Sequence, residues 1–121
     1  FDKGMELYME SLRSDLVDIQ GGTTGEGIHC GVMAGTVYDA LVSFAGLDLS
    51  GDTPTLNPRL PEGWKQISFS FLFQGIKYHV DLWGDEIEIL IESVEKDKIK
   101  VHICGEECTL IAGKKLVRTC K

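Results

Sequence analysis

The hydrophobic residues in the first part of the chain are spaced as in an amphipathic helix. They recur at steps of three and four residues: Met5, Tyr8, Met9, Leu12 and Leu16. This spacing places them on one helix face, opposite the charged residues between them. The pattern predicts a helix from about Lys3 to Leu16, which Gly21 and Gly22 separate from the next element.

A second helix is predicted from about Thr24 to Ala45. It is apolar almost all round, with Ile28, Val32, Met33, Ala34, Val37, Tyr38, Leu41, Val42 and Phe44. A helix with so little polar surface is normally buried on several sides. Thr23 and Glu26 fit a capping box, in which each side chain accepts a hydrogen bond from a backbone N–H at the helix start. Because two helices cannot cover so much apolar surface, we interpret them as the edge of a larger helical domain.

From Ile67 onward the hydrophobic period changes to two, which is typical of strands. Turn signals separate the alternating runs 67–73, 76–82, 87–91 and 99–103, and two short strands follow near 108–111 and 116–119. The proline-rich stretch before them is predicted to be a connector. The pattern predicts an antiparallel meander of about six strands, closing into a β-sandwich or half-barrel. The predicted fold class is α+β, with helices in residues 1–46 and a C-terminal β-sandwich domain in residues 47–121.

Composition and charge narrow the function classes. The 121 residues are 43% hydrophobic, enough for a folded core. The net charge of -7 argues against binding to nucleic acid or to an anionic membrane, because both need a dense basic patch. No apolar run approaches the roughly 20 residues that span a bilayer, and the first residues are too charged for a secretory signal. We therefore expect a cytoplasmic protein. Because the chain begins with Phe1, we interpret it as a piece of a longer one.

The four cysteines, Cys30, Cys104, Cys108 and Cys120, are interpreted as reduced thiols. A domain with a full apolar core does not need disulfides. The C-x₃-C spacing of Cys104 and Cys108 lacks the usual C-x₂-C metal pattern and a second pair, so no metal site is predicted.

The segment GGTTGEGIH, residues 21–29, holds the candidate chemistry. Helix N-termini expose unpaired N–H groups and the positive end of the helix dipole, so glycines, hydroxyls and an imidazole there suit a phosphate or carboxylate. On the pattern alone, a capped helix without any ligand is the more common explanation, and a histidine such as His29 more often packs in an interface. His79 and His102 are predicted to be solvent-exposed on strand faces. The acidic run that includes Glu88 and Glu92 is predicted to be a solvated face.

GGTTGEGIHCGVMAGT, FAGL and LNPRLPEGWKQISFSFLFQGIKYHV together resemble the C-terminal end of glycoside hydrolase family 65, over about residues 1–82. That family holds inverting phosphorylases acting on maltose, trehalose, kojibiose or nigerose, and a few hydrolases. The resemblance implies an (α/α)6 barrel whose last helices correspond to residues 1–45, followed by a β-sandwich.

The resemblance also implies a phosphate site. Carried over by position, Thr23, Thr24 and His29 would contact inorganic phosphate, with the backbone of Gly25 contributing. Phosphate would be the co-substrate, no other cofactor is implied, and the product would be β-glucose 1-phosphate. The family's general acid lies upstream of the matched segment, so no catalytic residue is assigned here and the fragment alone is expected to be inactive. The family also implies a possible homodimer.

Two alternatives stay open at this point. The parent could be a family 65 hydrolase that activates water, for which Glu26 is the available carboxylate. The chain could also be a stand-alone β-sandwich that binds a carbohydrate or a protein, with Trp64, Tyr78 and Trp83 stacking on a ligand. Tyr78 lies on the buried side of its strand alternation, and Trp64 follows a proline-glycine turn where it would cap the core. A structural role is therefore favoured for all three residues.

Overall fold

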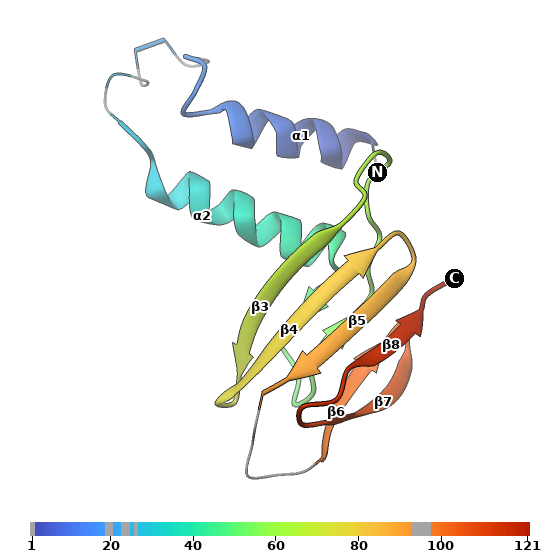
Figure 1. Ribbon diagram of the computed structural model, residues 1–121. Helices are drawn as coiled ribbons and strands as arrows, with labels where there is room; N and C mark the ends of the chain where they lie inside the picture. The colour runs from blue at the N-terminus through green and yellow to red at the C-terminus, as the bar shows by residue number, and fades with distance from the viewer. Residues whose placement is uncertain (1, 19–20, 23–24, 26, 93–97) are drawn as a thin grey trace. The chain divides into compact units, whose positions relative to one another are not determined.

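The computed structural model describes residues 2–18, 21–22, 25, 27–92 and 98–121 (Figure 1). The chain divides into two compact units, Phe1–Leu41 and Val42–Lys121, called here the helical unit and the β unit. Two helices followed by antiparallel-rich sheets confirm the predicted α+β class. The domain boundary between residues 46 and 47 stays a prediction.

The helical unit holds α1 (Asp2–Arg13) and α2 (Cys30–Asp39), and a π-helical turn, η2 (Ala40–Phe44), leads into the β unit. The prediction that the first helix extends to Leu16 is wrong by one turn. The backbone N–H groups of Leu16 and Val17 both donate to the carbonyl of Arg13, at 2.9 and 2.8 Å, so the chain tightens into a turn there.

The predicted start of the second helix at Thr24 is also wrong, because α2 begins at Cys30. Gly27 has φ +102°, which a helix does not accept, and His29 is the extended N-cap residue with φ -83° and ψ 93°. The two residues of the predicted capping box, Thr23 and Glu26, lie outside the described residues. The positive φ of Gly27 is therefore one reason why this helix does not begin earlier in the chain.

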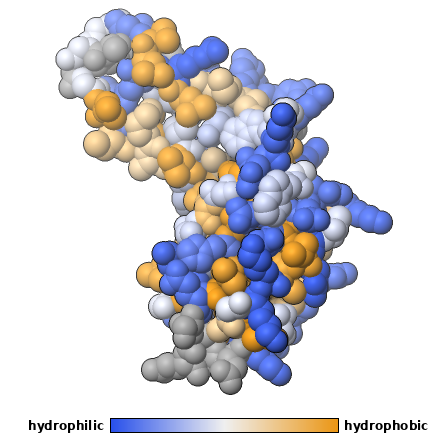
Figure 2. All heavy atoms as spheres, in the orientation of Figure 1, coloured by the Kyte–Doolittle hydropathy of each residue, from blue (hydrophilic) through white to orange (hydrophobic). Residues whose placement is uncertain are grey.

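The helical unit has little enclosed interior. Among its described residues only Thr36 is buried, with its hydroxyl donating to the carbonyl of Val32 at 2.8 Å. Large apolar side chains are exposed instead: Leu7, Met9, Leu12, Leu16, Val17, Ile28, Val32, Val37 and Tyr38. Figure 2 shows hydrophobic side chains at the surface over these helices. This is the surface that the sequence analysis assigns to a larger helical domain.

The β unit contains two four-stranded sheets. The first has the order β1-β2-β6-β7, and its strands are β1 (Leu47–Asp48), β2 (Thr55–Leu56), β6 (Lys98–Ile103) and β7 (Glu106–Ile111). The second has the order β3-β4-β5-β8, and its strands are β3 (Ile67–Phe73), β4 (Ile76–Trp83), β5 (Glu86–Ile91) and β8 (Leu116–Thr119). Strand β5 contacts β7 of the other sheet.

A continuous meander, as predicted, is present only from β3 to β5. The β6–β7 hairpin joins the other sheet, where β6 pairs in parallel with β2, and β8 returns to pair with β5. Alternation predicts which face of a strand is buried, but it does not identify the strand's neighbour. The strands β1 and β2 inside the predicted connector are too short to produce a periodic signal.

The core of the β unit is formed by inward residues of both sheets. Its fully enclosed members include Leu56, Val80, Leu82, Ile87, Ile89, Ile91 and Val101. Gly46, with φ +65°, fixes the entry into this unit, because a Cβ there would collide with the backbone of Asn57. The Asn57 N–H donates to the Gly46 carbonyl at 3.1 Å, so the two segments pass at close range.

Cys104 and Cys120 form a disulfide, so the prediction that all four cysteines are reduced is wrong for this pair. Cys104 follows β6 and Cys120 follows β8, and their Cα atoms are 5.8 Å apart. The bond therefore joins the two sheets. Spacing in the sequence could not reveal this disulfide. Because β8 pairs with β5 in the other sheet, Cys120 comes close to Cys104 only when the two sheets have formed. Cys30 and Cys108 are free thiols, exposed and buried respectively.

Candidate functional site

The candidate anion site falls on the segment between α1 and α2. Of the four residues assigned to this site, the structure describes Gly25 and His29. The other two, Thr23 and Thr24, lie outside the described residues. Gly21, Gly22 and Gly27 all have positive φ, so this segment uses backbone conformations that glycine adopts most readily. The site is therefore built on a glycine-dependent loop that leads into α2.

His29 occupies the N-cap position of α2 rather than its first turn. Its carbonyl accepts hydrogen bonds from the N–H groups of Val32 at 3.0 Å and Met33 at 3.1 Å. Its side chain makes no capping hydrogen bond to the helix. The imidazole is therefore attached to the positively polarised end of α2 without satisfying that end itself.

Asp15, in the turn after α1, holds His29 at two points. One carboxylate oxygen, Oδ2, accepts the backbone N–H of His29 at 2.7 Å. The other, Oδ1, lies 2.7 Å from the ring nitrogen Nδ1. The Asp15 side chain is only 6% exposed, whereas the His29 side chain is 42% exposed. The pair therefore has an enclosed carboxylate and an accessible ring.

The sequence analysis did not identify Asp15. It lies in the turn after α1, which had been included in the first helix, and it is 14 residues from His29. The segment between them includes Gly21, Gly22 and Gly27, all with positive φ. A carboxylate just after a helix and an imidazole just before the next are a weak signal, because only the loop geometry brings them together.

The hydrogen bond from His29 lowers the pKa of the Asp15 carboxyl below its ordinary value of 3.8, and the His29 charge acts in the same direction. Asp15 is therefore ionised throughout the neutral range. A depressed carboxyl pKa means that the stabilising interaction is present above the ordinary value and is lost as the pH falls through the lowered one. The site thus combines a fixed negative charge with an imidazole at a helix N-terminus.

The other two histidines are partly exposed and also contact glutamates. His79 Nε2 lies 2.8 Å from Glu92, and its Nδ1 lies 2.7 Å from the Ser70 hydroxyl. His102 Nε2 lies 3.6 Å from Glu107. The prediction of solvent-exposed strand faces holds in part, since these side chains are 34% and 43% exposed. Ser70 and Glu92 thus contact the two ring nitrogens of His79 on one face of the β3-β4-β5-β8 sheet.

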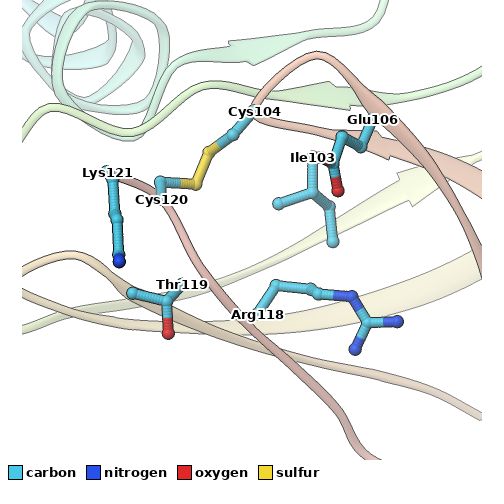
Figure 3. Close-up of a pocket in the computed structure, with 7 residues that line it drawn as sticks. All are labelled: Ile103, Cys104, Glu106, Arg118, Thr119, Cys120 and Lys121. Carbon is cyan, nitrogen blue, oxygen red and sulfur yellow. A yellow bond between two sulfur atoms is a disulfide. The ribbon is translucent and has the colours of Figure 1, made fainter.

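A cavity of about 330 Å³ lies beside the disulfide, between the β6–β7 turn and the end of β8 (Figure 3). Its lining includes the side chains of Glu106, Arg118 and Lys121 as well as Cys104 and Cys120. The Arg118 guanidinium donates to the carbonyl of the adjacent Val117 at 2.8 Å. Cations and a carboxylate share this cavity, so it does not select one charge of ligand.

The aromatic residues do not form a shared platform for a sugar. Tyr78 is 1% exposed and stacks on Phe71 at 4.6 Å between ring centroids. Trp64 meets Phe44 edge-on at 5.2 Å. Trp83 is 37% exposed. These contacts support the structural role that the sequence favours for Trp64 and Tyr78.

The described residues contain neither a metal-binding cluster nor a membrane-spanning helix. No three His, Cys, Asp or Glu side chains in that part of the chain gather as a metal-binding group. None of the helices described there is long and apolar enough to cross a membrane.

Comparison with known proteins adds the family. Residues 47–110, more than half of the chain, match the model of the C-terminal domain of glycosyl hydrolase family 65. The chain belongs to glycosyl hydrolase family 65. The resemblance seen in the sequence is thereby confirmed.

Family 65 relatives of this chain include named phosphorylases. The trehalose 6-phosphate phosphorylase of Lactococcus lactis is 39% identical over 93 residues, which cover 77% of this chain and 11% of that protein. The 1,2-alpha-glucosylglycerol phosphorylase of Bacillus selenitireducens is 30% identical over 116 residues, which cover 90% of this chain and 15% of that protein. The chain thus spans a small fraction of the length of these relatives.

A solved structure confirms the fold. A putative kojibiose phosphorylase from the human microbiome superposes with a TM-score of 0.80 and 24% identity, over 94% of this chain and 14% of that one. The arrangement of two helices followed by β-sheets therefore matches a segment of a much larger protein.

Proposed function

We propose that this chain is the C-terminal part of an inverting glycoside phosphorylase, and that Thr23, Thr24, Gly25 and His29 contribute part of its phosphate site. The parent would cleave an α-glucosyl disaccharide with inorganic phosphate and release β-glucose 1-phosphate. The observation that carries the proposal is the accessible His29 ring at the N-cap of α2, in a chain whose named relatives include phosphorylases.

The chemistry of the segment supports phosphate as its ligand. Backbone N–H groups at the start of a helix, the helix dipole and an imidazole all favour an anion. Inversion requires a nucleophile on the face of the sugar opposite the leaving oxygen, while a general acid protonates that oxygen. In this proposal the segment holds the nucleophile, phosphate, and the acid is supplied from outside these 121 residues.

The exposed apolar face of the helical unit fits the same proposal. Its large side chains, such as Val37 and Tyr38, would pack against the rest of a helical barrel in the parent. On this view the fragment alone has no activity. Inorganic phosphate is the co-substrate, no other cofactor is needed, and a cytoplasmic location and a homodimer stay predictions.

The test is phosphate dependence in the full-length protein that carries this chain. It is incubated with a panel of α-glucosyl disaccharides with and without phosphate, and the anomeric form of any glucose 1-phosphate is read by NMR. Cleavage that requires phosphate and yields the β-anomer supports the proposal. Release of free glucose at an equal rate without phosphate would identify a hydrolase instead.

The role of His29 is tested in the same assay. His29→Ala is expected to raise the KM for phosphate by about tenfold or more, because an interaction made with the bound anion is lost. His79→Ala is the matched control, since it removes an imidazole from the β unit. Equal phosphate KM values for the two variants would remove His29 from the site.

A further inference from the structure

Little of the Asp15 side chain is exposed to solvent, although the residue lies in the turn after α1. Its side chain is 6% exposed, and removing a carboxylate from water is costly unless its oxygens accept hydrogen bonds. Both oxygens do so here, and both bonds come from His29. The geometry of this carboxylate is therefore directed at a single residue.

A role in loop structure alone would need only the bond to the backbone N–H of His29. That bond already ties the end of the loop to the turn after α1. The second bond, to Nδ1 at 2.7 Å, fixes how the ring is rotated. A carboxylate can only accept, so Nδ1 is the donor in this contact, and holding Nδ1 also fixes the direction in which Nε2 points.

We infer that Asp15 is a positioning residue, which fixes the rotation of the His29 imidazole through Nδ1 so that Nε2 is directed at the phosphate. This inference rests on the phosphate site proposed above. The two ring nitrogens lie on opposite sides of the imidazole, so a ring held at Nδ1 by Asp15 has a fixed direction for Nε2.

Asp18 provides the matched control for this inference. It belongs to the same segment, and its two oxygens accept the backbone N–H of Gly22 at 2.8 and 2.6 Å. That contact supports the loop, and it is made to a backbone N–H and not to an imidazole. Asp15→Asn and Asp18→Asn therefore make the same chemical change in one loop, at the ring and away from it.

The experiment measures initial rates of the full-length protein as a function of inorganic phosphate, at a saturating concentration of its disaccharide. Asp15→Asn is expected to raise the KM for phosphate about tenfold or more, with kcat at saturating phosphate falling far less. Asp18→Asn is expected to leave the phosphate KM within about twofold of the wild type. A melting curve of each variant checks that it is folded.

Two results would overturn the inference while leaving the proposed function intact. One is a phosphate KM for Asp15→Asn equal to that of the wild type. The other is a loss of kcat and melting temperature without a selective rise in the phosphate KM, which marks a structural role. If Asp15→Asn does not fold, Asp15→Glu is used, because it keeps the charge and displaces it by one methylene. An unchanged phosphate KM in that variant would also count against the inference.

The same data separate a failure of the proposed function. If the wild-type protein cleaves its disaccharide equally well without phosphate, the proposed phosphate site itself is contradicted. In that case the function fails before Asp15 is considered. A phosphate-dependent wild type with an unaffected Asp15→Asn variant removes only the role of Asp15.

Discussion

The two units of the chain differ in how far their apolar side chains are buried. In the β unit, inward residues of both sheets, such as Ile89 and Val101, are fully enclosed. In the helical unit, Val37 and Tyr38 are exposed, and Thr36 is the buried residue among those described. The β unit thus has the interior of an independent domain. The helical unit leaves large apolar side chains exposed, and the prediction is that further structure covers them in a longer protein; the chain spans a small share of its relatives.

The largest expected effect tests this contrast directly. Ile89→Ala is expected to lower the free energy of unfolding of the β unit by about 2–5 kcal/mol, because it opens a cavity in an enclosed core. Val37→Ala in the helical unit is expected to change it by less than about 0.5 kcal/mol. Denaturant titration of the 121-residue chain, followed by the fluorescence of Trp64 and Trp83, measures both. Similar effects of the two substitutions would contradict the contrast.

The disulfide gives the next largest effect and is confined to the β unit. Its partners are 16 residues apart in sequence, and a crosslink closing a loop of about this size stabilises by about 3 kcal/mol. Reduction with dithiothreitol, or Cys104→Ser, should lower the unfolding midpoint accordingly. Cys30→Ser is the control, because Cys30 is a free and exposed thiol. A midpoint insensitive to reduction would show that the crosslink does not stabilise the sheets.

The smallest expected effect concerns the exposed counterpart of the Asp15–His29 pair. Glu92 contacts His79 at 2.8 Å, but its side chain is 56% exposed. That contact and the charge of Lys77 lower the pKa of Glu92 below 4.5, so its contribution is present at neutral pH and disappears as the pH falls through the lowered value. Because solvent screens this pair, Glu92→Gln should move the melting temperature at pH 7 only slightly.

The measurement is a pair of melting curves for the wild type and Glu92→Gln at pH 7 and at pH 3. Any difference at pH 7 should vanish at the lower pH. A large difference that persists at pH 3 would mean that Glu92 acts through packing rather than through its charge.

Much of the fold follows from the sequence, and the reasons for the misses are physical. Alternation predicted the buried positions of β4 and β5, because side-chain direction in a strand is a local property. Partner choice is not local, so the crossing of β6 and β7 to the other sheet was missed. The Cys104–Cys120 disulfide was missed for the same reason, since it joins elements of different sheets.

The candidate site shows the same division. His29 could be singled out because a histidine beside glycines at a helix start is a visible pattern. Asp15 could not be singled out, because it is 14 residues from His29 in the sequence. The two residues meet only in the folded loop, in which Gly21, Gly22 and Gly27 have positive φ. The sequence thus predicts the residue that would meet a ligand, and the structure is needed to find the residue that orients it.

The parallel pairing of β2 with β6 has a consequence for the order of folding. Thr55 pairs with His102 and Leu56 with Ile103, so this contact spans a long stretch of chain that includes β3, β4 and β5. Hairpins such as β3–β4 and β6–β7 close short loops and can form early, whereas a long loop costs more entropy to close. During synthesis, β1 and β2 can pair with each other early, but β2 must wait for β6 to emerge from the ribosome before its other edge is paired. Until then, the segment that follows α2 carries a strand with one edge open.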